Sequence, residues 1–276
     1  MEWHRVKNII IVILLLINGF LLVLVGTRKS EARRYEQSAL EGAILVLQEN
    51  GISLSENVIA APSGRTPGTM ERSITLEAQA ASALLGESTE GANRGGGLYI
   101  YATDAGQISF RSGGELSSAL NDDPRWHTDD PVSHAAALAA DLGTSFRLVD
   151  SRISGGSGLV VYQQLLDGAP LFSCGITFAY ENGRLTELNG TLLTAEVPAP
   201  ESGEVLSLPT VLMHVLDELL TNGSVSSAFL AVEPGWLPEQ SFNDAIRLNP
   251  VWYIATNTTD YYVDGLTGEV SPAAEN

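Results

Sequence analysis

The feature that most constrains this chain is an apolar run near its N-terminus, Ile9 to Val25, which reads IIIVILLLINGFLLVLV. Asn18 and Gly19 are the two residues that interrupt it. Seventeen helical residues span about 26 Å, close to the ~30 Å hydrocarbon core of a bilayer. A helix also satisfies its own backbone polar groups in lipid. The run therefore predicts a transmembrane helix over residues 9–26.

The alternative for this run is a cleaved signal peptide. The apolar regions of signal peptides are usually ~7–15 residues long and precede a small-residue cleavage site. Here the run is longer, and basic residues follow it directly: Arg28, Lys29, Arg33 and Arg34. We therefore expect an uncleaved anchor, with residues 1–8 as a short cytoplasmic tail.

The charges beside the anchor and those of the remaining chain point to opposite orientations. Arg5 and Lys7 precede the run and four basic residues follow it, so the positive-inside rule alone places the C-terminal side in the cytoplasm. Long domains, however, cross membranes largely regardless of charge. After Glu36 the chain has nine arginines, no lysine and thirty acidic residues, a net charge of −21. We expect a single-pass cell-membrane protein with a cytoplasmic N-terminus and an extracytoplasmic ectodomain.

This acidic balance limits the partners of the ectodomain. Binding to nucleic acid needs a basic surface, so no nucleic-acid partner is expected. The same charge argues against an ectodomain that lies flat on anionic lipid. The single cysteine, Cys174, cannot form an internal disulfide, so the fold must depend on its hydrophobic core.

Periodicity and turn residues divide the ectodomain into a stalk and three units. Residues 27–59 are expected to form a juxtamembrane helix or stalk, because the apolar positions between 30 and 49 share one helical stripe. Residues 60–130 form a first module. Its expected elements are a helix over 76–85, a hairpin of strands at 98–102 and 107–111, and an irregular polar segment over 116–131.

The second module (131–197) and the third (205–272) share an order, a helix followed by antiparallel strands. Asp167-Gly168 and Asn182-Gly183 supply the positive φ angles that two-residue hairpins need. The expected helices are 131–143 and 208–220, and the expected strands are 146–153, 158–166, 170–180, 184–194, 225–232, 246–255, 261–264 and 269–271. The predicted fold class is α+β: a transmembrane helix followed by tandem modules, each with one helix covering an antiparallel sheet.

The one dense acidic cluster is the segment DDPRWHTDD, which contains Asp122, Asp123, His127, Asp129 and Asp130. Clustered carboxylates with a histidine can bind a divalent cation. The spacing fits no EF-hand, and an arginine lies in the middle of the segment. We expect a solvated acidic loop rather than a metal site.

Other chemically reactive side chains receive structural interpretations. Cys174 lies in an apolar strand and is expected to be a small buried hydrophobe. His214 and Glu218 are i, i+4 neighbours on a helix, which predicts a local polar pair. Trp236 and Trp252 are expected in the core or at its rim. The sequence has no H-E-x-x-H, G-x-S-x-G or P-loop pattern, so we expect no enzyme, no metal and no cofactor.

Asn18 and Gly19 are the candidate partner-binding residues. A polar amide in lipid seeks a hydrogen-bonding partner, and glycine allows a second helix backbone to approach closely. The alternative is an asparagine tolerated in a lone helix. The pair suggests a contact with another transmembrane helix.

Four stretches together resemble the YycI/YycH-type regulatory proteins of Gram-positive bacteria. The chain opens with a Met-Glu-Trp…Lys-Asn-Ile pattern that leads into the anchor. Val161 to Phe172 (VYQQLLDGAPLF) is similar to that family's strand–turn–strand, and Leu193-Thr194 corresponds to its second-module boundary. Leu248 to Val270 (LNPVWYIATNTTDYYVDGLTGEV) is similar to its closing hairpin, a pattern that also occurs in PepSY-like modules.

The resemblance implies a signal-transduction protein without enzymatic activity. Its partners would be a sister YycH-type protein and the sensor histidine kinase of the essential cell-wall two-component system, whose activity it would modulate through transmembrane and ectodomain contacts. Two alternatives remain: a ligand-binding or protease-inhibiting PepSY-like ectodomain, and an exported hydrolase that uses the acidic loop.

Overall fold

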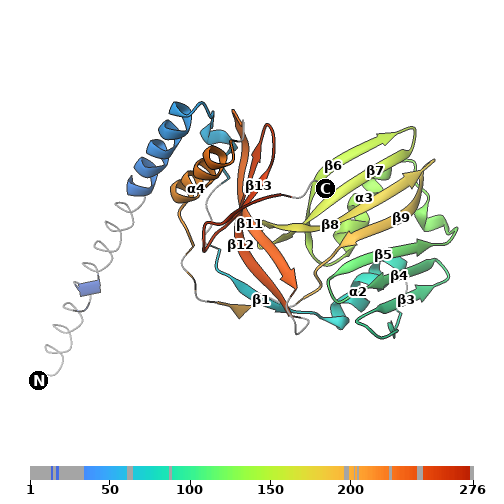
Figure 1. Ribbon diagram of the computed structural model, residues 1–276. Coiled ribbons are helices and arrows are strands. Elements are labelled where there is room, and N and C mark those ends of the chain that lie inside the picture. Colours follow the sequence, from blue (N-terminus) through green and yellow to red (C-terminus); the bar gives the residue numbers. More distant parts are fainter. Residues whose placement is uncertain are drawn as a thin grey trace, which may run out of the picture.

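A computed structural model describes most of the chain outside its N-terminal region (Figure 1). The described residues are 14, 17–18, 34–60, 65–86, 89–195, 199–201, 203, 205–223, 226–240 and 245–273. They form two groups of β-strands, each with helices on one face. The predicted α+β class is confirmed.

The first sheet is antiparallel and has both α2 (Ile74–Leu85) and α3 (Pro131–Asp141) on one face. Their shared core includes Trp126, Tyr101 and Phe178, each at most 1% exposed. In spatial order the strands are β2 (Ala92–Asn93), β3 (Tyr99–Thr103), β4 (Gly106–Phe110), β5 (Glu115–Leu120), β9 (Arg184–Thr191), β8 (Ala169–Glu181), β7 (Ser157–Leu166) and β6 (Ser145–Ser154). The predicted boundary between residues 130 and 131 therefore falls inside one sheet and one core.

The second sheet is built on β11 (Phe229–Gln240) and β12 (Ala245–Thr256), which pair along almost their whole length. On the other edge of β12, β1 (Gly68–Glu71) pairs with its first half and β13 (Tyr261–Asp264) with its second half. β10 (Ala199–Pro200) and β14 (Val270–Pro272) extend these edges. The two sheets meet where Trp236 of β11 pairs in parallel with Leu171 of β8.

One face of the second sheet is covered by α4 (Leu208–Thr221) and by a helix over residues 34–49. Strand alternation decides which side chains reach these helices, because successive residues point to opposite faces. Trp252 and Ile254 of β12 and Val232 of β11 lie in the core under the helices. Tyr253 and Glu233 consequently point to the other face.

The local sequence explains where the two helices on the first sheet, α2 and α3, begin and end. Ser73 precedes α2, and its hydroxyl accepts a hydrogen bond from Leu76 N at 3.4 Å; Gly86 ends the helix in the left-handed region, at φ 73°. Asp130 precedes α3, and one of its carboxylate oxygens accepts from Ser133 N at 3.2 Å. Pro131 occupies the first turn, where a missing N–H costs nothing.

Two predicted segments differ from the structure. The segment predicted to be irregular over 116–131 contains strand β5, which pairs with β4 and with the distant β9 and buries Leu116. The strand predicted over 225–232 is the longer β11, which continues through Pro234 and Pro238. Among the described segments, β11 has β12 on one edge, and on the other it has a single pair with β8 and a bridge from Val232 to Ile59. Proline is tolerated on an edge that is only partly paired.

Among the described residues, no helix is both long and apolar enough to cross a bilayer. Of the predicted anchor over residues 9–26, only Leu14, Ile17 and Asn18 are described, and all three are exposed in a helical conformation. The anchor and its orientation therefore stay predictions.

Candidate functional site

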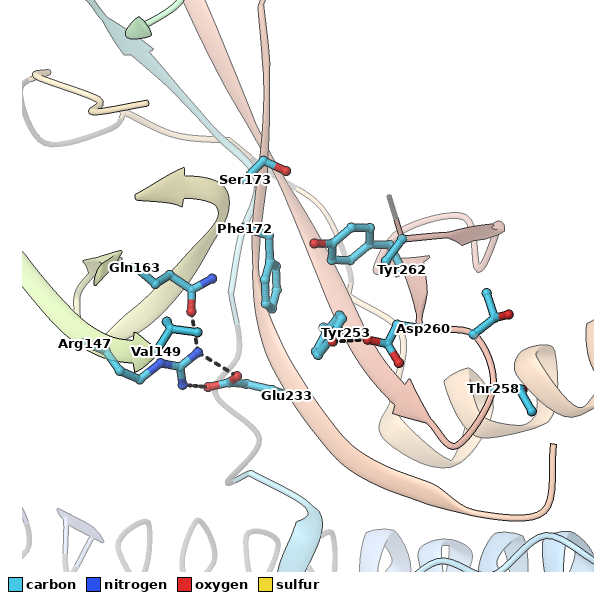
Figure 2. A pocket seen from close by; sticks show the side chains of 12 residues that line it. Arg147, Val149, Gln163, Phe172, Ser173, Glu233, Tyr253, Thr258, Asp260 and Tyr262 are labelled. Carbon is cyan, nitrogen blue, oxygen red and sulfur yellow. Dashed lines mark hydrogen bonds and ion pairs between the residues drawn. The ribbon is translucent and has the colours of Figure 1, made fainter. Parts of the chain in front are cut away.

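A cavity of about 420 Å³ lies at the junction of the two sheets. Figure 2 shows its side chains converging from both sheets and from the loop after β12. Those lining it are Arg147, Val149, Gln163, Phe172, Ser173, Glu233, Tyr253, Thr258, Thr259, Asp260, Tyr262 and Ala273. This is the best candidate site in the described part of the chain, because both sheets contribute polar and aromatic groups to it.

An ion pair between the sheets forms one side of the cavity. Arg147 of β6 holds Glu233 of β11 with two nitrogens, Nη1 to Oε1 at 2.5 Å and Nη2 to Oε2 at 3.1 Å. Gln163 of β7 accepts a further hydrogen bond from Arg147 Nη2. A forked arginine–carboxylate contact fixes orientation as well as distance, so this pair sets how the edge of the first sheet meets the second.

Three aromatic rings form the opposite side. The centroid of Phe172 lies 5.5 Å from that of Tyr253 and 5.3 Å from that of Tyr262, and the two tyrosines are 5.6 Å apart. Phe172 is buried, whereas both tyrosines are partly exposed. Tyr262 lies between Tyr261 and Val263, which point into the helix-covered core. The alternation of β13 thus places Tyr262 on the cavity face.

Asp260 is held beside these rings by its own turn. Its Oδ2 accepts a hydrogen bond from the Tyr253 hydroxyl at 2.5 Å, and its Oδ1 accepts from Thr256 N at 3.0 Å. Thr256 Oγ1 in turn accepts from the backbone N–H of Thr258 and Thr259, each at 3.1 Å. These short-range bonds fix the loop from which Asp260 faces the cavity.

Burial moves the pKa values of the two phenols further above neutral pH. It raises the pKa of Tyr253 well above the usual value for tyrosine, and the hydrogen bond to Asp260 adds to the rise. Burial likewise raises the pKa of Tyr262. Both phenols are protonated near pH 7, as tyrosine is at its ordinary pKa of 10.0, and Tyr253 is a hydrogen-bond donor to the carboxylate. The site offers π faces, hydroxyls and carboxylates, a set suited to binding.

The acidic cluster predicted from sequence serves mainly as turn and cap chemistry. Asp122 Oδ1 lies 3.0 Å from His127 Nε2, while Asp123 caps the short 3-10 helix η2 (Pro124–Trp126) and Asp130 caps α3. The pKa of each of these three carboxyls is lowered, for Asp122 first by the His127 contact, and for the caps by the hydrogen bonds they accept. Within the described ranges, no three potential ligands gather in a metal-binding group.

The remaining sequence candidates have separate surroundings. Cys174 is buried at the apolar junction of the sheets, and burial raises the pKa of its thiol to about 12. Glu218 accepts a hydrogen bond from Asn222 Nδ2 at 2.5 Å. The ring of His214 lies close to Gly268 instead. The two residues of the predicted His214–Glu218 pair therefore have different neighbours. Trp236 is 8% exposed with an arginine over its ring, and Trp252 lies in the core.

The predicted partner-binding pair is described only in part. Asn18 is exposed, and its Nδ2 donates to Leu14 O at 2.9 Å within the helix. Gly19 lies outside the described residues. The transmembrane contact therefore stays a prediction.

Sequence reasoning missed the cavity although it examined two of the segments that line it. The segment 248–270 is similar to a family hairpin, but that likeness does not indicate that its residues Tyr253, Asp260 and Tyr262 line a cavity. Strand alternation is the usable signal, because it places Tyr262 on the face opposite to Tyr261 and Val263. The pairing of Arg147 with Glu233, 86 positions apart, has no sequence signal.

Comparison with known proteins assigns no family. No family model matches the sequence, and no curated protein matches it. An uncharacterized protein from Eubacterium rectale ATCC 33656 has a similar structure at 12% identity, over 76% of this chain and 86% of that chain, with a TM-score of 0.48. The Bacillus megaterium YpeB C-terminal domain is similar at 10% identity, over 74% of this chain and 99% of that one, with a TM-score of 0.36. Likenesses this low identify neither a family nor a function.

Proposed function

We propose that this chain is a non-enzymatic, membrane-anchored regulator that receives a partner in the cavity between its sheets and couples that contact to its N-terminal helix. One observation carries the proposal: the second sheet is two-sided. Glu233, Tyr253 and Tyr262 face the cavity, and the residues next to each of them face the helices on the opposite side. If binding shifts these strands, the helices packed against them should move as well.

The helix over residues 34–49 provides the route to the membrane. Its residues Ala43 and Leu47 are 6% and 0% exposed and pack in the same core as α4. The described part of this helix begins at residue 34, nine positions after Val25, where the apolar run ends. Because it is docked on the sheet rather than projecting as a free stalk, its position depends on the sheet that lines the cavity.

The partner we propose is a sensor histidine kinase of a cell-wall two-component system, together with a sister YycH-type protein. The sequence resemblance supports this choice, as does the amide–glycine pair Asn18-Gly19 within the apolar run. Regulation of this kind needs a coupling free energy of only ~1–3 kcal/mol. One or two contacts between helices supply that amount.

A second candidate function is a PepSY-like ectodomain that binds a ligand or inhibits a protease without help from the anchor. The cavity favours it, since about 420 Å³ lies within the ~300–1,000 Å³ range of small-molecule sites. The two candidates differ in whether the membrane segment matters.

Crosslinking in cells, followed by purification of the full chain, separates them. A matched chain carries an unrelated transmembrane helix in place of residues 9–26. We expect the native chain to recover a sensor kinase and the matched chain to recover less of it, because the proposed contact has one part in the cavity and one part in the membrane segment. Equal recovery by both chains would place the whole contact in the ectodomain, and recovery by neither would reject the kinase and favour the second candidate.

A further inference from the structure

We infer that the cavity at the sheet junction binds an organic cation, an alkylammonium or guanidinium group, held by the Asp260 carboxylate and the ring faces of Tyr253 and Tyr262. The inference rests on the proposed function, because it names the chemistry of the group that the cavity receives. It makes no use of the kinase or of the anchor, so it can fail or succeed separately from them.

The charges that line the cavity favour a positive ligand. Two carboxylates, Glu233 and Asp260, face one guanidinium, that of Arg147. Both oxygens of Glu233 are already bound to Arg147, which also donates to Gln163. The charges of Arg147 and Glu233 cancel, so the net charge of the cavity is that of the Asp260 carboxylate.

The position of Asp260 leaves it free to accept more. A carboxylate has about four lone-pair sites, and Asp260 uses one for the Tyr253 hydroxyl and one for Thr256 N. In Figure 2, Asp260 lies beside Tyr253 and Tyr262, while Arg147 and Glu233 lie on the other side of Phe172. A cation at Asp260 therefore avoids the arginine.

The aromatic rings favour the same ligand. A cation within ~6 Å of a ring centroid is attracted by the π face. Phe172 is buried, whereas Tyr253 and Tyr262 are partly exposed. The tyrosines also present neutral rings, since a phenol is protonated near pH 7. The rings can thus pack along the carbon chain of a ligand while its charged end reaches Asp260.

An anion is disfavoured by the same geometry. The guanidinium of Arg147 is the one cationic group among the residues that line this cavity, and an anion would have to displace Glu233 from it. The chain as a whole has a net charge of −18, and such a field attracts cations and repels anions. Inorganic phosphate is therefore the matched negative probe.

Two sources can present such a cation: a free amine, or a lysine or arginine side chain of a partner protein. We would titrate the full chain in detergent micelles with n-butylammonium, with Ac-Ala-Lys-Ala-NH₂, and with the same peptide carrying norleucine. Isothermal titration gives the affinities. The ¹⁹F signals of 3-fluorotyrosine, assigned with Tyr253→Phe and Tyr262→Phe, locate the bound probe.

We expect both ammonium probes to bind saturably and to shift the signals of Tyr253 and Tyr262, whereas the norleucine peptide and phosphate do not. A lysine peptide that binds more tightly than n-butylammonium identifies a partner side chain as the source; equal affinities identify a free amine. Equal binding of the lysine and norleucine peptides, phosphate binding at these tyrosines, or no shift by either ammonium probe would overturn the inference.

Variants separate the carboxylate from the rings. Asp260→Asn keeps an oxygen for Thr256 N and should weaken ammonium binding about tenfold, the effect of losing ~1.4 kcal/mol. Tyr262→Leu removes a ring and should also weaken binding, while Tyr262→Phe keeps the π face and should not. Glu187→Gln removes an exposed carboxylate on β9, outside the cavity, and is the matched control. Unchanged affinity in both Asp260→Asn and Tyr262→Leu would contradict the proposed contacts.

The outcomes for the two proposals stay distinguishable. Binding of ammonium probes with no kinase recovered would support the cavity chemistry and reject the kinase as partner. Anchor-dependent recovery of a kinase with no ammonium binding would do the reverse.

Discussion

Gln164 and Leu193 exchange two hydrogen bonds of 2.9 Å: the amide Nε2 of Gln164 donates to Leu193 O, and Leu193 N donates to Gln164 Oε1. The glutamine is 3% exposed. Its side chain thus satisfies the backbone N–H and C=O of Leu193, which no described strand pairs, just after β9 ends. The bond pair fixes the chain at the apolar junction between the sheets, where Leu193 packs with Leu171 and Trp236.

Gln164→Leu should lower the free energy of unfolding by about 2–4 kcal/mol, because it leaves a buried N–H and a buried C=O of Leu193 without partners. Urea unfolding followed by circular dichroism measures this loss. Gln107→Leu, at an exposed position on β4, is the control and should change stability little. Equal effects of the two substitutions would show that the paired amide contributes nothing.

Arg72 and Glu77 form a buried ion pair with side-chain exposures of 11% and 1%. Arg72 also donates to Gly97 O at 2.6 Å. Glu77→Ala leaves this arginine buried without its carboxylate and should cost about 3–5 kcal/mol of stability. The exposed pair Arg111–Glu115 is the comparison, and Glu115→Ala should cost less than ~1 kcal/mol. Thermal unfolding of both variants tests the contrast, which a loss under 1 kcal/mol for Glu77→Ala would contradict.

The run of four strands from β6 to β9 could be predicted because its signals are local. Asp167 and Asn182 adopt φ of 49° and 51°, the positive angles expected for two-residue hairpins. Helices α2, α3 and α4 were likewise indicated by periodicity and by their end residues. Each of these features depends on residues within a few positions of one another.

Strand pairings between segments far apart in the sequence could not be predicted. β5 pairs with β9 through Ser117 and Asn189, and nothing in either segment specifies the other. Polar residues such as those of β5 become a strand because the sheet supplies hydrogen-bonding edges on both sides. The cavity arises in the same way, from the meeting of two sheets whose contact is set by tertiary packing.

Stability should fall as the pH rises from about 9 towards 12, since burial raises the pKa of Cys174 and of Tyr101 to about 12 in the folded chain. In the unfolded chain these groups titrate near their ordinary values of 9.0 and 10.0. The unfolded state therefore releases protons first, and the free energy of unfolding decreases with pH in this window. The stabilisation is fully present below pH ~9.

Urea midpoints at pH ~8 and ~10.5 measure this dependence. Cys174→Ala removes the contribution of the thiol and should make the decline between these values shallower. A pH-independent midpoint in the native sequence would contradict the burial of both groups. In the folded chain at pH 8, Cys174 should also react with Ellman's reagent far more slowly than after unfolding.

Asp130→Ala should lower the free energy of unfolding, because the carboxylate caps α3 and accepts from both Ser133 N and Ser133 Oγ, at 3.2 and 2.6 Å. The pKa of Asp130 is lowered by these bonds, so its contribution is present above the ordinary value of 3.8 and is lost as the pH falls through the folded value. Asp129→Ala, one residue earlier and exposed, is the control. Denaturant unfolding at pH ~7 and ~3 should show a larger difference between the variants at the higher pH.

Leu47→Ala tests whether the helix over residues 34–49 is docked on the second sheet. Leu47 is fully buried, whereas Leu45, two residues earlier, is 59% exposed. Removing the buried side chain should cost about 2–5 kcal/mol. It should also speed hydrogen exchange of the amides in this helix, because the helix loses a buried side chain from the core that it shares with α4 and the second sheet. Leu45→Ala deletes the same atoms from the exposed face and should change neither quantity. If the two substitutions have equal effects, the helix is a free stalk, and contact in the cavity has no route through it to the membrane segment.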